Sequence, residues 1–541
     1  MPAKQPMRVT IIVAALATST LAADHPVIAQ STPVWGTLEP GPYQAGYRVI
    51  YELDRSRIWR VEPDSQPYQE TARPIRISVW YPAEKGTHSS AMTLAEFVQD
   101  SAPSPYFDEL NHLLEGRFVD IFSGVSRELY DTLLTLPLAT VKNAVPASGS
   151  FPLVLYSPGG QASFPDNGVL SSYLASHGYV VASVPQLGAM LEGRFRGYGR
   201  QAQVQTRDIE FAAGVMRDFP GVDPRRVAVV GYSLGGTVAL RVALNNPNVD
   251  AIVGLDPSFA YARSIEALVD PQSFDVFDLR IPVLSLQAGN EESQRYHSQV
   301  IHDTLRFSDR YIGKVAATVH GDFSEIKPML IPAIAIGEEL DPALVNGHHG
   351  YMASCRYVLN FLNSVLKQDT GGASFVAASS GANGMEAGLV QMELRHGAEV
   401  PTEAEFAASV RQHGYETTSQ LLRSLQTEYP DLAVVREDVM NGLAHRLLAA
   451  GDPDPAIGVF RLNIQVYPNS ARAHDGLADT YLSKGDSLMV IRTYERLLEI
   501  LPNDTTLSQS AKNRLRQNAE LRLQLLRHTR PGGAGGVRFP A

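Results

Sequence analysis

Apolar positions follow one pattern before about residue 369 and another pattern after it. In the first part, short runs of consecutive apolar residues alternate with stretches of helical period. The apolar runs lie at 151–156, 179–184, 226–230, 251–255, 283–286 and 314–319, and the helical stretches at 167–177, 204–219 and 351–366. Consecutive apolar residues are typical of parallel strands that helices cover on both faces. With strand candidates at 46–53 and 75–81, the pattern predicts a three-layer α/β sheet over residues 40–368.

The segment 91–145 differs because it carries helical patches and no strand signal, which predicts a helical insertion before the central strands. Its apolar positions would suit a lid over an acyl pocket. Helices that simply pack on the sheet would carry the same residues, so both roles stay open. The positions concerned are Leu94, Phe97, Phe107, Leu110 and Leu113.

Residues 369–388 are rich in Gly, Ala and Ser, which is typical of a linker, and residues 389–529 show only helical patterns. Several positions recur at a spacing of 34 residues: Leu443, Ala444, Gly451, Phe460 and Pro468 return as Leu477, Ala478, Gly485, Tyr494 and Pro502. This spacing is the tetratricopeptide period, and it predicts an all-α domain of repeats with capping helices. A disordered tail is expected at 530–541.

Residues 1–29 have the pattern of an export signal. Basic residues precede an apolar core at 9–16, and small residues suit cleavage after Ala23 or Ala29. The chain has one cysteine, Cys355, so no intramolecular disulfide forms, which is more typical of bacterial than of eukaryotic export. We therefore expect a bacterial periplasmic or secreted protein.

The motif with the clearest chemistry is Gly-Tyr-Ser-Leu-Gly-Gly at Gly231–Gly236. It follows the apolar run 226–230 and leads into a helical pattern. Strand, G-x-S-x-G and helix form the context of a nucleophile elbow, a sharp turn that lifts a serine hydroxyl clear of the sheet. Glycines two residues before and after the serine leave room, because a Cβ there would clash in so tight a turn. The motif predicts Ser233 as a nucleophile.

A serine hydroxyl needs a base, which in this arrangement is a histidine later in the chain. His320 fits best, because it ends the apolar run 314–319 and opens a Gly-Asp-Phe loop. His348 and His349 are rivals in a glycine-flanked loop that follows no strand. The context favours His320.

Two places suit the acid that orients the histidine. Asp256 follows the strand 251–255 in a Leu-Asp-Pro turn. Glu291 and Glu292 follow the next strand, which is the commoner position, but in a loose polar loop typical of solvated carboxylates. Position alone leans toward Asp256 and leaves the two glutamates as alternatives.

The oxyanion that develops on an acyl carbonyl needs two backbone N–H donors. One is expected from Leu234, directly after the nucleophile, and the other from the loop after the first central strand. That loop reads Ser-Pro-Gly-Gly-Gln at 157–161. Pro158 has no N–H, so Gly160 is the best candidate and Gln161 the next.

Four segments carry a family resemblance: Ile77–Pro82, Phe151–Gly159, Gly231–Gly236 and Val319–Phe323. Together they resemble the platelet-activating-factor acetylhydrolase branch of the α/β-hydrolases, with its bacterial dienelactone-hydrolase-like relatives. The resemblance implies that the acid follows the strand after the nucleophile helix, which favours Asp256, and that the second oxyanion donor is Gly160. Tyr232 and Pro158 stand where that family often has histidine, which leaves the substrate preference open.

These observations predict an exported serine hydrolase that cleaves small-molecule or lipid-like carboxylic esters without a cofactor. A serine peptidase or amidase would use the same triad and is the nearest alternative. A different class is an interaction module, in which the repeats bind a protein partner or a second copy of the chain. The net charge of −11 and the lack of a basic block argue against nucleic acid, and no histidine spacing suggests a metal site.

Overall fold

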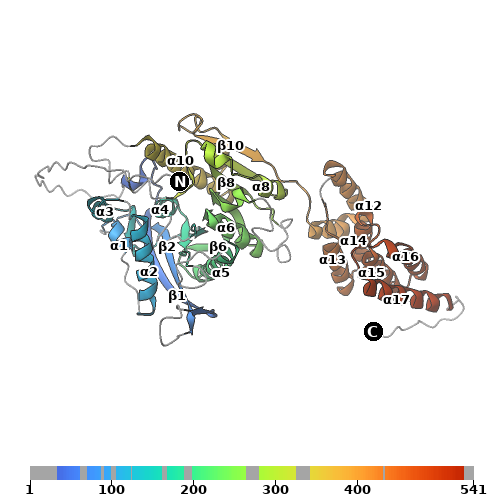
Figure 1. The fold of residues 1–541 in the computed structure, drawn as a ribbon. Helices are drawn as coiled ribbons and strands as arrows, with labels where there is room; N and C mark the ends of the chain where they lie inside the picture. Colours follow the sequence, from blue (N-terminus) through green and yellow to red (C-terminus); the bar gives the residue numbers. More distant parts are fainter. Residues whose placement is uncertain are drawn as a thin grey trace, which may run out of the picture. The chain divides into compact units, whose positions relative to one another are not determined.

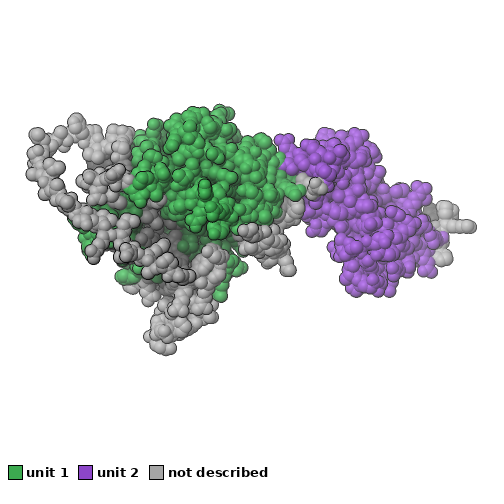
Figure 2. Space-filling view, turned by 45° about the horizontal axis from the view of Figure 1, so that its top comes forward, with its two compact units in different colours: residues 1–397 green, residues 398–541 purple. Residues whose placement is uncertain are grey.

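The computed structural model describes residues 33–60, 70–86, 90–98, 105–122, 125–160, 167–187, 198–262, 279–324, 330, 341–430 and 433–528. The predicted export signal at 1–29 and the predicted tail at 530–541 lie outside the described residues. The chain divides into two units, residues 1–397 and 398–541, which Figure 2 shows in different colours.

In the described part of the first unit, ten strands form one sheet in the order β10-β9-β8-β7-β6-β4-β5-β2-β1-β3 (Figure 1). They are β1 (Gln44–Arg60), β2 (Glu70–Ala83), β3 (Thr140–Lys142), β4 (Phe151–Ser157), β5 (Val180–Ser183), β6 (Val222–Tyr232), β7 (Val249–Leu255), β8 (Val283–Ala288), β9 (Arg310–Val315) and β10 (Val390–Arg395). The strands from β5 to β9 in this order are parallel, and β2 and β10 flank them as antiparallel neighbours. Parallel strands bring their carboxyl ends to one edge, where α/β proteins carry their sites.

Helices cover both faces of this sheet. The described ones are α1 (Leu94–Val98), α2 (Pro105–Ile121), α3 (Arg127–Leu134), α4 (Gly168–Ser176), α5 (Tyr198–Met216), α6 (Leu234–Asn245), α7 (Glu291–Gln294), α8 (Val300–Thr304), α10 (Pro342–Leu366) and α11 (Thr370–Ala377). Alternate residues of β4 enter opposite layers: Val154 and Tyr156 join the core cluster of α4 and α10, while Leu153 and Leu155 join that of α5 and α6. The three-layer α/β sheet predicted from the apolar runs is confirmed.

The insertion 91–145 packs on the sheet. Its five candidate lid residues are buried in a core cluster or half-buried against it: Leu94, Phe97, Phe107, Leu110 and Leu113. The Phe97 ring lies 4.9 Å from the Tyr47 ring and 6.0 Å from the Trp80 ring, measured between centroids. This packing favours the alternative to a lid. The segment also supplies β3, which sequence reasoning missed because three residues are too short to show alternation.

The linker predicted at 369–388 does not form, and the helical domain does not begin at 389 as predicted. This stretch belongs to the first unit, since it supplies α11 and leads into β10, which pairs with β9 at the sheet edge. Gly372 lies so close to α10 that a Cβ there would be 2.5 Å from the Asn360 carbonyl oxygen. Small residues therefore serve close helix packing here rather than flexibility, and the second unit begins at Ala398.

The described secondary structure of the second unit is helical. Its helices are α12 (Glu403–Glu428), α13 (Glu437–Ala449), α14 (Pro453–Val466), α15 (Ala471–Ser483), α16 (Ser487–Ile500) and α17 (Gln509–His528). α15 begins 34 residues after α13, and α16 begins 34 residues after α14. Gly451 and Gly485 end equivalent helices with φ angles of +82° and +76°, which glycine adopts without strain. The 34-residue recurrence in the sequence is thus a recurrence of structure. None of the described helices is long and apolar enough to cross a membrane.

Candidate active site

Ser233 lies in a strained turn between β6 and α6. Its backbone has a φ of +53° and a ψ of −119°, a conformation that residues other than glycine rarely adopt. The Ser233 N–H donates to the Leu255 carbonyl oxygen at 3.1 Å, which ties the turn to β7. A Cβ at Gly231 would overlap the Gly235 carbonyl group, so the turn requires the glycines that the motif supplies. The fold thus presents the Ser233 hydroxyl at the carboxyl edge of the parallel strands.

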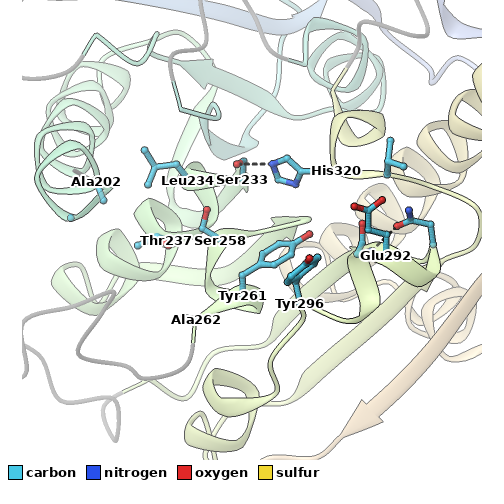
Figure 3. Close-up of a pocket in the computed structure, with 14 residues that line it drawn as sticks. Ala202, Ser233, Leu234, Thr237, Ser258, Tyr261, Ala262, Glu292, Tyr296 and His320 are labelled. Carbon is cyan, nitrogen blue, oxygen red and sulfur yellow. Dashed lines mark hydrogen bonds between the residues drawn. The ribbon is translucent and has the colours of Figure 1, made fainter. Parts of the chain in front are cut away.

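His320 faces Ser233 across a hydrogen bond. Its Nε2 lies 2.9 Å from the Ser233 Oγ (Figure 3). His320 does not end a strand as predicted, because β9 already ends at Val315, and it opens the short 3-10 helix η5 (His320–Phe323) instead. Asp322 holds this turn by accepting the Val319 N–H at 2.9 Å. The Asp-containing loop therefore positions the imidazole.

Tyr232 supports the imidazole from the other direction. Its ring stacks on the His320 ring with 5.2 Å between centroids and an interplanar angle of 29°. Its hydroxyl donates to the His320 carbonyl oxygen at 3.1 Å. Tyr232 therefore contacts both the ring and the backbone of His320.

Asp256 completes the chain of hydrogen bonds. Its Oδ2 lies 2.6 Å from the His320 Nδ1. A carboxylate only accepts, so the Nδ1 proton lies between them and Nε2 is left to accept from Ser233. Asp256 is fully buried and follows β7 with a φ of +38°, which turns its side chain toward η5.

Asp256 has three further donors. The Ala288 N–H donates to Oδ1 at 2.9 Å, the His297 Nε2 lies 3.2 Å from the same oxygen, and the Tyr261 hydroxyl donates to Oδ2 at 2.5 Å. Burial alone would raise the pKa of Asp256. The hydrogen bonds from His297, His320, Tyr261 and the Ala288 N–H outweigh this effect and hold that pKa well below its usual value. The carboxylate stays ionised, as the partner of an imidazolium must.

The structure does not bring the alternative residues into this chain. Glu291 and Glu292 lie in α7, and the Glu291 side chain is 96% exposed. His348 and His349 lie inside α10 rather than in a loop, because that helix begins at Pro342 and not near 351 as predicted. His348 is buried, and a Cβ at Gly36 would be 2.7 Å from its Nε2.

The two predicted oxyanion donors lie on segments that touch. Leu234 is the first residue of α6, whose first N–H groups have no acceptor within the helix. Gly160 lies in the turn after β4. A Cβ at Gly235 would overlap the Ser157 carbonyl oxygen, so the start of α6 packs directly on that loop. Gln161, the second choice, lies outside the described residues.

A pocket of about 720 Å³ opens beside Ser233. Leu234 and Ala202 lie on one side of the hydrogen-bonded Ser and His pair, and Glu292 lies on the other side, near Tyr296 (Figure 3). The pocket therefore reaches both sides of the Ser233 and His320 pair. Among the described residues, no group of three or more His, Cys, Asp or Glu side chains could hold a metal ion.

Sequence reasoning missed Tyr261 and His297. Neither residue belongs to a motif, and they lie 5 and 41 positions from the Asp256 that they contact. Only the folding of η2 (Ser258–Tyr261) and of the segment after α7 brings them to that carboxylate.

Comparisons with known proteins each cover part of this chain. A family model described as PET hydrolase-like matches residues 139–271, a range that includes Ser233 and Asp256 and ends before His320. Chlorophyllase type 0 from Chenopodium album is 28% identical over 166 residues, covering 26% of this chain and 45% of that protein. Chlorophyllase-1, chloroplastic, from Citrus sinensis is 28% identical over 166 residues, covering 28% of this chain and 46% of that protein. The chain thus spans less than half the length of these curated relatives.

A solved structure of a ferulic acid esterase from Streptomyces cinnamoneus aligns with 65% of this chain and 96% of its own, with a TM-score of 0.46 and 22% identity. The parallel sheet, the strained serine turn and the PET hydrolase-like match point to one fold. The first unit has an α/β-hydrolase fold. Within that fold, the platelet-activating-factor acetylhydrolase branch stays a prediction.

Proposed function

We propose that this protein is an exported serine hydrolase that cleaves carboxylic esters through an acyl-enzyme. The observation that carries the proposal is the unbroken chain of hydrogen bonds from Ser233 through His320 to the ionised Asp256, at the wall of a pocket. Nucleophile, base and orienting acid stand within the reach that acyl transfer requires.

In the proposed reaction the Ser233 Oγ attacks the acyl carbonyl carbon while the His320 Nε2 takes the hydroxyl proton. The carbonyl oxygen becomes an oxyanion, which the N–H groups of Leu234 and Gly160 bind. His320 then passes its proton to the leaving alcohol, and the C–O bond breaks. Water attacks the acyl-enzyme by the same sequence and releases the acid.

The PET hydrolase-like match supports an ester as the scissile bond, because it covers the nucleophile and acid segments. The plant relatives are named chlorophyllases, and the overlap with them is too short to assign their substrate to this chain. An amide is the alternative, since the same triad serves both and an amine leaves less readily. Export is proposed from the pattern of residues 1–29 alone.

Replacement of the nucleophile tests the proposal. Ser233→Ala is expected to lower the kcat for p-nitrophenyl esters by about 10⁴-fold or more, and to abolish labelling by a fluorophosphonate. A matched ester and amide with the same acyl group should show the ester cleaved faster. Full esterase activity in Ser233→Ala, or no labelling of the wild-type protein, would remove the proposal.

We assign the second unit to the tetratricopeptide-like class, with a protein partner or a second copy of the chain as its ligand. Support comes from the 34-residue recurrence of helices and of left-handed glycines. Repeats of this kind stack into extended binding surfaces.

A further inference from the structure

Asp256 belongs to a closed ring of hydrogen bonds that no sequence motif predicts. Its Oδ1 accepts the Ala288 N–H at 2.9 Å and lies 3.2 Å from the His297 Nε2. The Ala288 carbonyl oxygen, in turn, lies 2.6 Å from the Gln294 Nε2. The same amide nitrogen lies 3.0 Å from the His297 Nδ1, which closes the ring.

Each member of the ring determines the proton of the next. A carbonyl oxygen only accepts, so Ala288 requires the amide nitrogen of Gln294, rather than its oxygen, to face it. That nitrogen carries two protons, and the second one points at the His297 Nδ1, which must therefore accept. The single ring proton of His297 is then on Nε2, where it donates to Asp256.

Burial makes this arrangement rigid. The His297 side chain is 3% exposed and the Asp256 side chain 0%. The His297 ring also packs against the Tyr261 ring at 4.6 Å between centroids. With Nδ1 accepting from Gln294, Nε2 is the ring nitrogen that donates to Asp256.

We propose that His297 is a positioning residue of ester hydrolysis, whose Nε2–H holds the Asp256 carboxylate so that Oδ2 meets the His320 Nδ1. Oδ1 is held by His297 and the Ala288 N–H, which leaves Oδ2 for His320 and Tyr261. Without His297 the carboxylate loses one of the two donors that set its rotation. This inference rests on the proposed function and adds a residue to it.

His297→Leu tests the inference. Its kcat is expected to fall by about 10- to 100-fold, as for the loss of one hydrogen bond to a charged group, with KM changed less than about threefold, because His297 does not line the described pocket. The acid limb of kcat/KM should move to higher pH. With one donor fewer on Asp256, more of its negative charge acts on His320, and that charge stabilises the His320 imidazolium.

His297→Gln is the conservative variant, since its amide can place an N–H near the position of Nε2. It should keep kcat within about threefold of wild type and the wild-type pH limb. Gln294→Leu, which removes the support of the imidazole, should shift both quantities as His297→Leu does, to a smaller extent. His396→Leu is the matched control, because that histidine is 76% exposed, and it should leave both quantities unchanged.

Several outcomes would overturn the inference. A His297→Leu variant with wild-type kcat and pH limb contradicts it, and so does equal loss in His297→Leu and His297→Gln that follows the folded fraction measured by calorimetry. If His297→Leu does not fold, an unchanged Gln294→Leu rejects the inference. Fluorophosphonate labelling of Ser233 separates this failure from that of the proposed function, because an active, labelled wild type leaves the latter standing.

Discussion

The two units reach their structures by contacts of different range. In the first unit the residues of the hydrogen-bonded site come from four places along the chain: the Ser233 turn, the Asp256 turn, the segment after α7 and η5. In the second unit each helix packs on its sequence neighbours, and the same pair of helices returns after 34 residues. A substitution at a long-range contact of the first unit is therefore expected to affect one site. Equivalent substitutions in the two repeats of the second unit are expected to have equal effects on its stability.

The largest effect that separates the units is expected from one methyl group at Gly235. In Gly235→Ala the new Cβ overlaps the Ser157 carbonyl oxygen, and backbone on both sides leaves neither atom free to turn away. We expect a loss of about 3 kcal/mol in the free energy of unfolding, with a fall of about 100-fold or more in esterase activity. Urea denaturation and steady-state kinetics measure the two.

Gly214→Ala is the matched control, because Gly214 lies in α5 with nothing within 4 Å of the new Cβ. It should stabilise the first unit by about 0.5–1 kcal/mol. An unharmed Gly235→Ala would mean that the start of α6 does not pack on the end of β4 and the loop after it.

The next effect is a contrast in pH dependence. Burial lowers the pKa of His302 in the first unit to about 4, and burial, with the charge of Asp479, raises the pKa of Asp475 in the second unit to about 6. The unfolded chain takes up the proton of His302 at higher pH than the folded chain, so this contribution to stability is lost as pH falls from about 6.5 to 4. The contribution of Asp475 is lost in the opposite direction, as pH rises from about 4 to 6.

Two variants isolate these contributions. His302→Gln should flatten the decline of the first unit toward pH 4 by an amount on the order of 2–3 kcal/mol. Asp475→Asn should stabilise the second unit at pH 7 and have less effect at pH 4. Hydrogen exchange read by mass spectrometry follows each unit through its own peptides, and shifts of the same sign in both units would end the contrast.

The smallest effect tests whether the two repeats are equivalent. Gly451→Ala and Gly485→Ala each force a Cβ into a left-handed conformation, with φ angles of +82° and +76° and nothing within 4 Å. Each should cost about 1 kcal/mol in the free energy of unfolding of the second unit. Costs that differ by more than about 1 kcal/mol would show that the two repeats, although matched in sequence, contribute unequally to the stability of the second unit.

The parts of the fold predicted from sequence are those with a local signal. The runs of apolar residues predicted the parallel strands, because burial on both faces requires apolar side chains at consecutive positions. The edge strands β3 and β10 were missed, since short, partly exposed strands lack that pattern. The linker expected at 369–388 failed because glycine and alanine serve close helix packing as well as flexibility.

By itself the sequence determined the nucleophile turn at Ser233 and the period of the helical repeats, because strand, tight turn and helix pairs are encoded by neighbouring residues. It also pointed to His320, although it placed that residue at the end of a strand. Only the tertiary structure decided that Asp256, rather than Glu291 or Glu292, meets His320, and that His297 stands behind it. Those contacts join segments 41 and 64 residues apart, and a pairing across such distances depends on how strands and loops assemble, which no local pattern records.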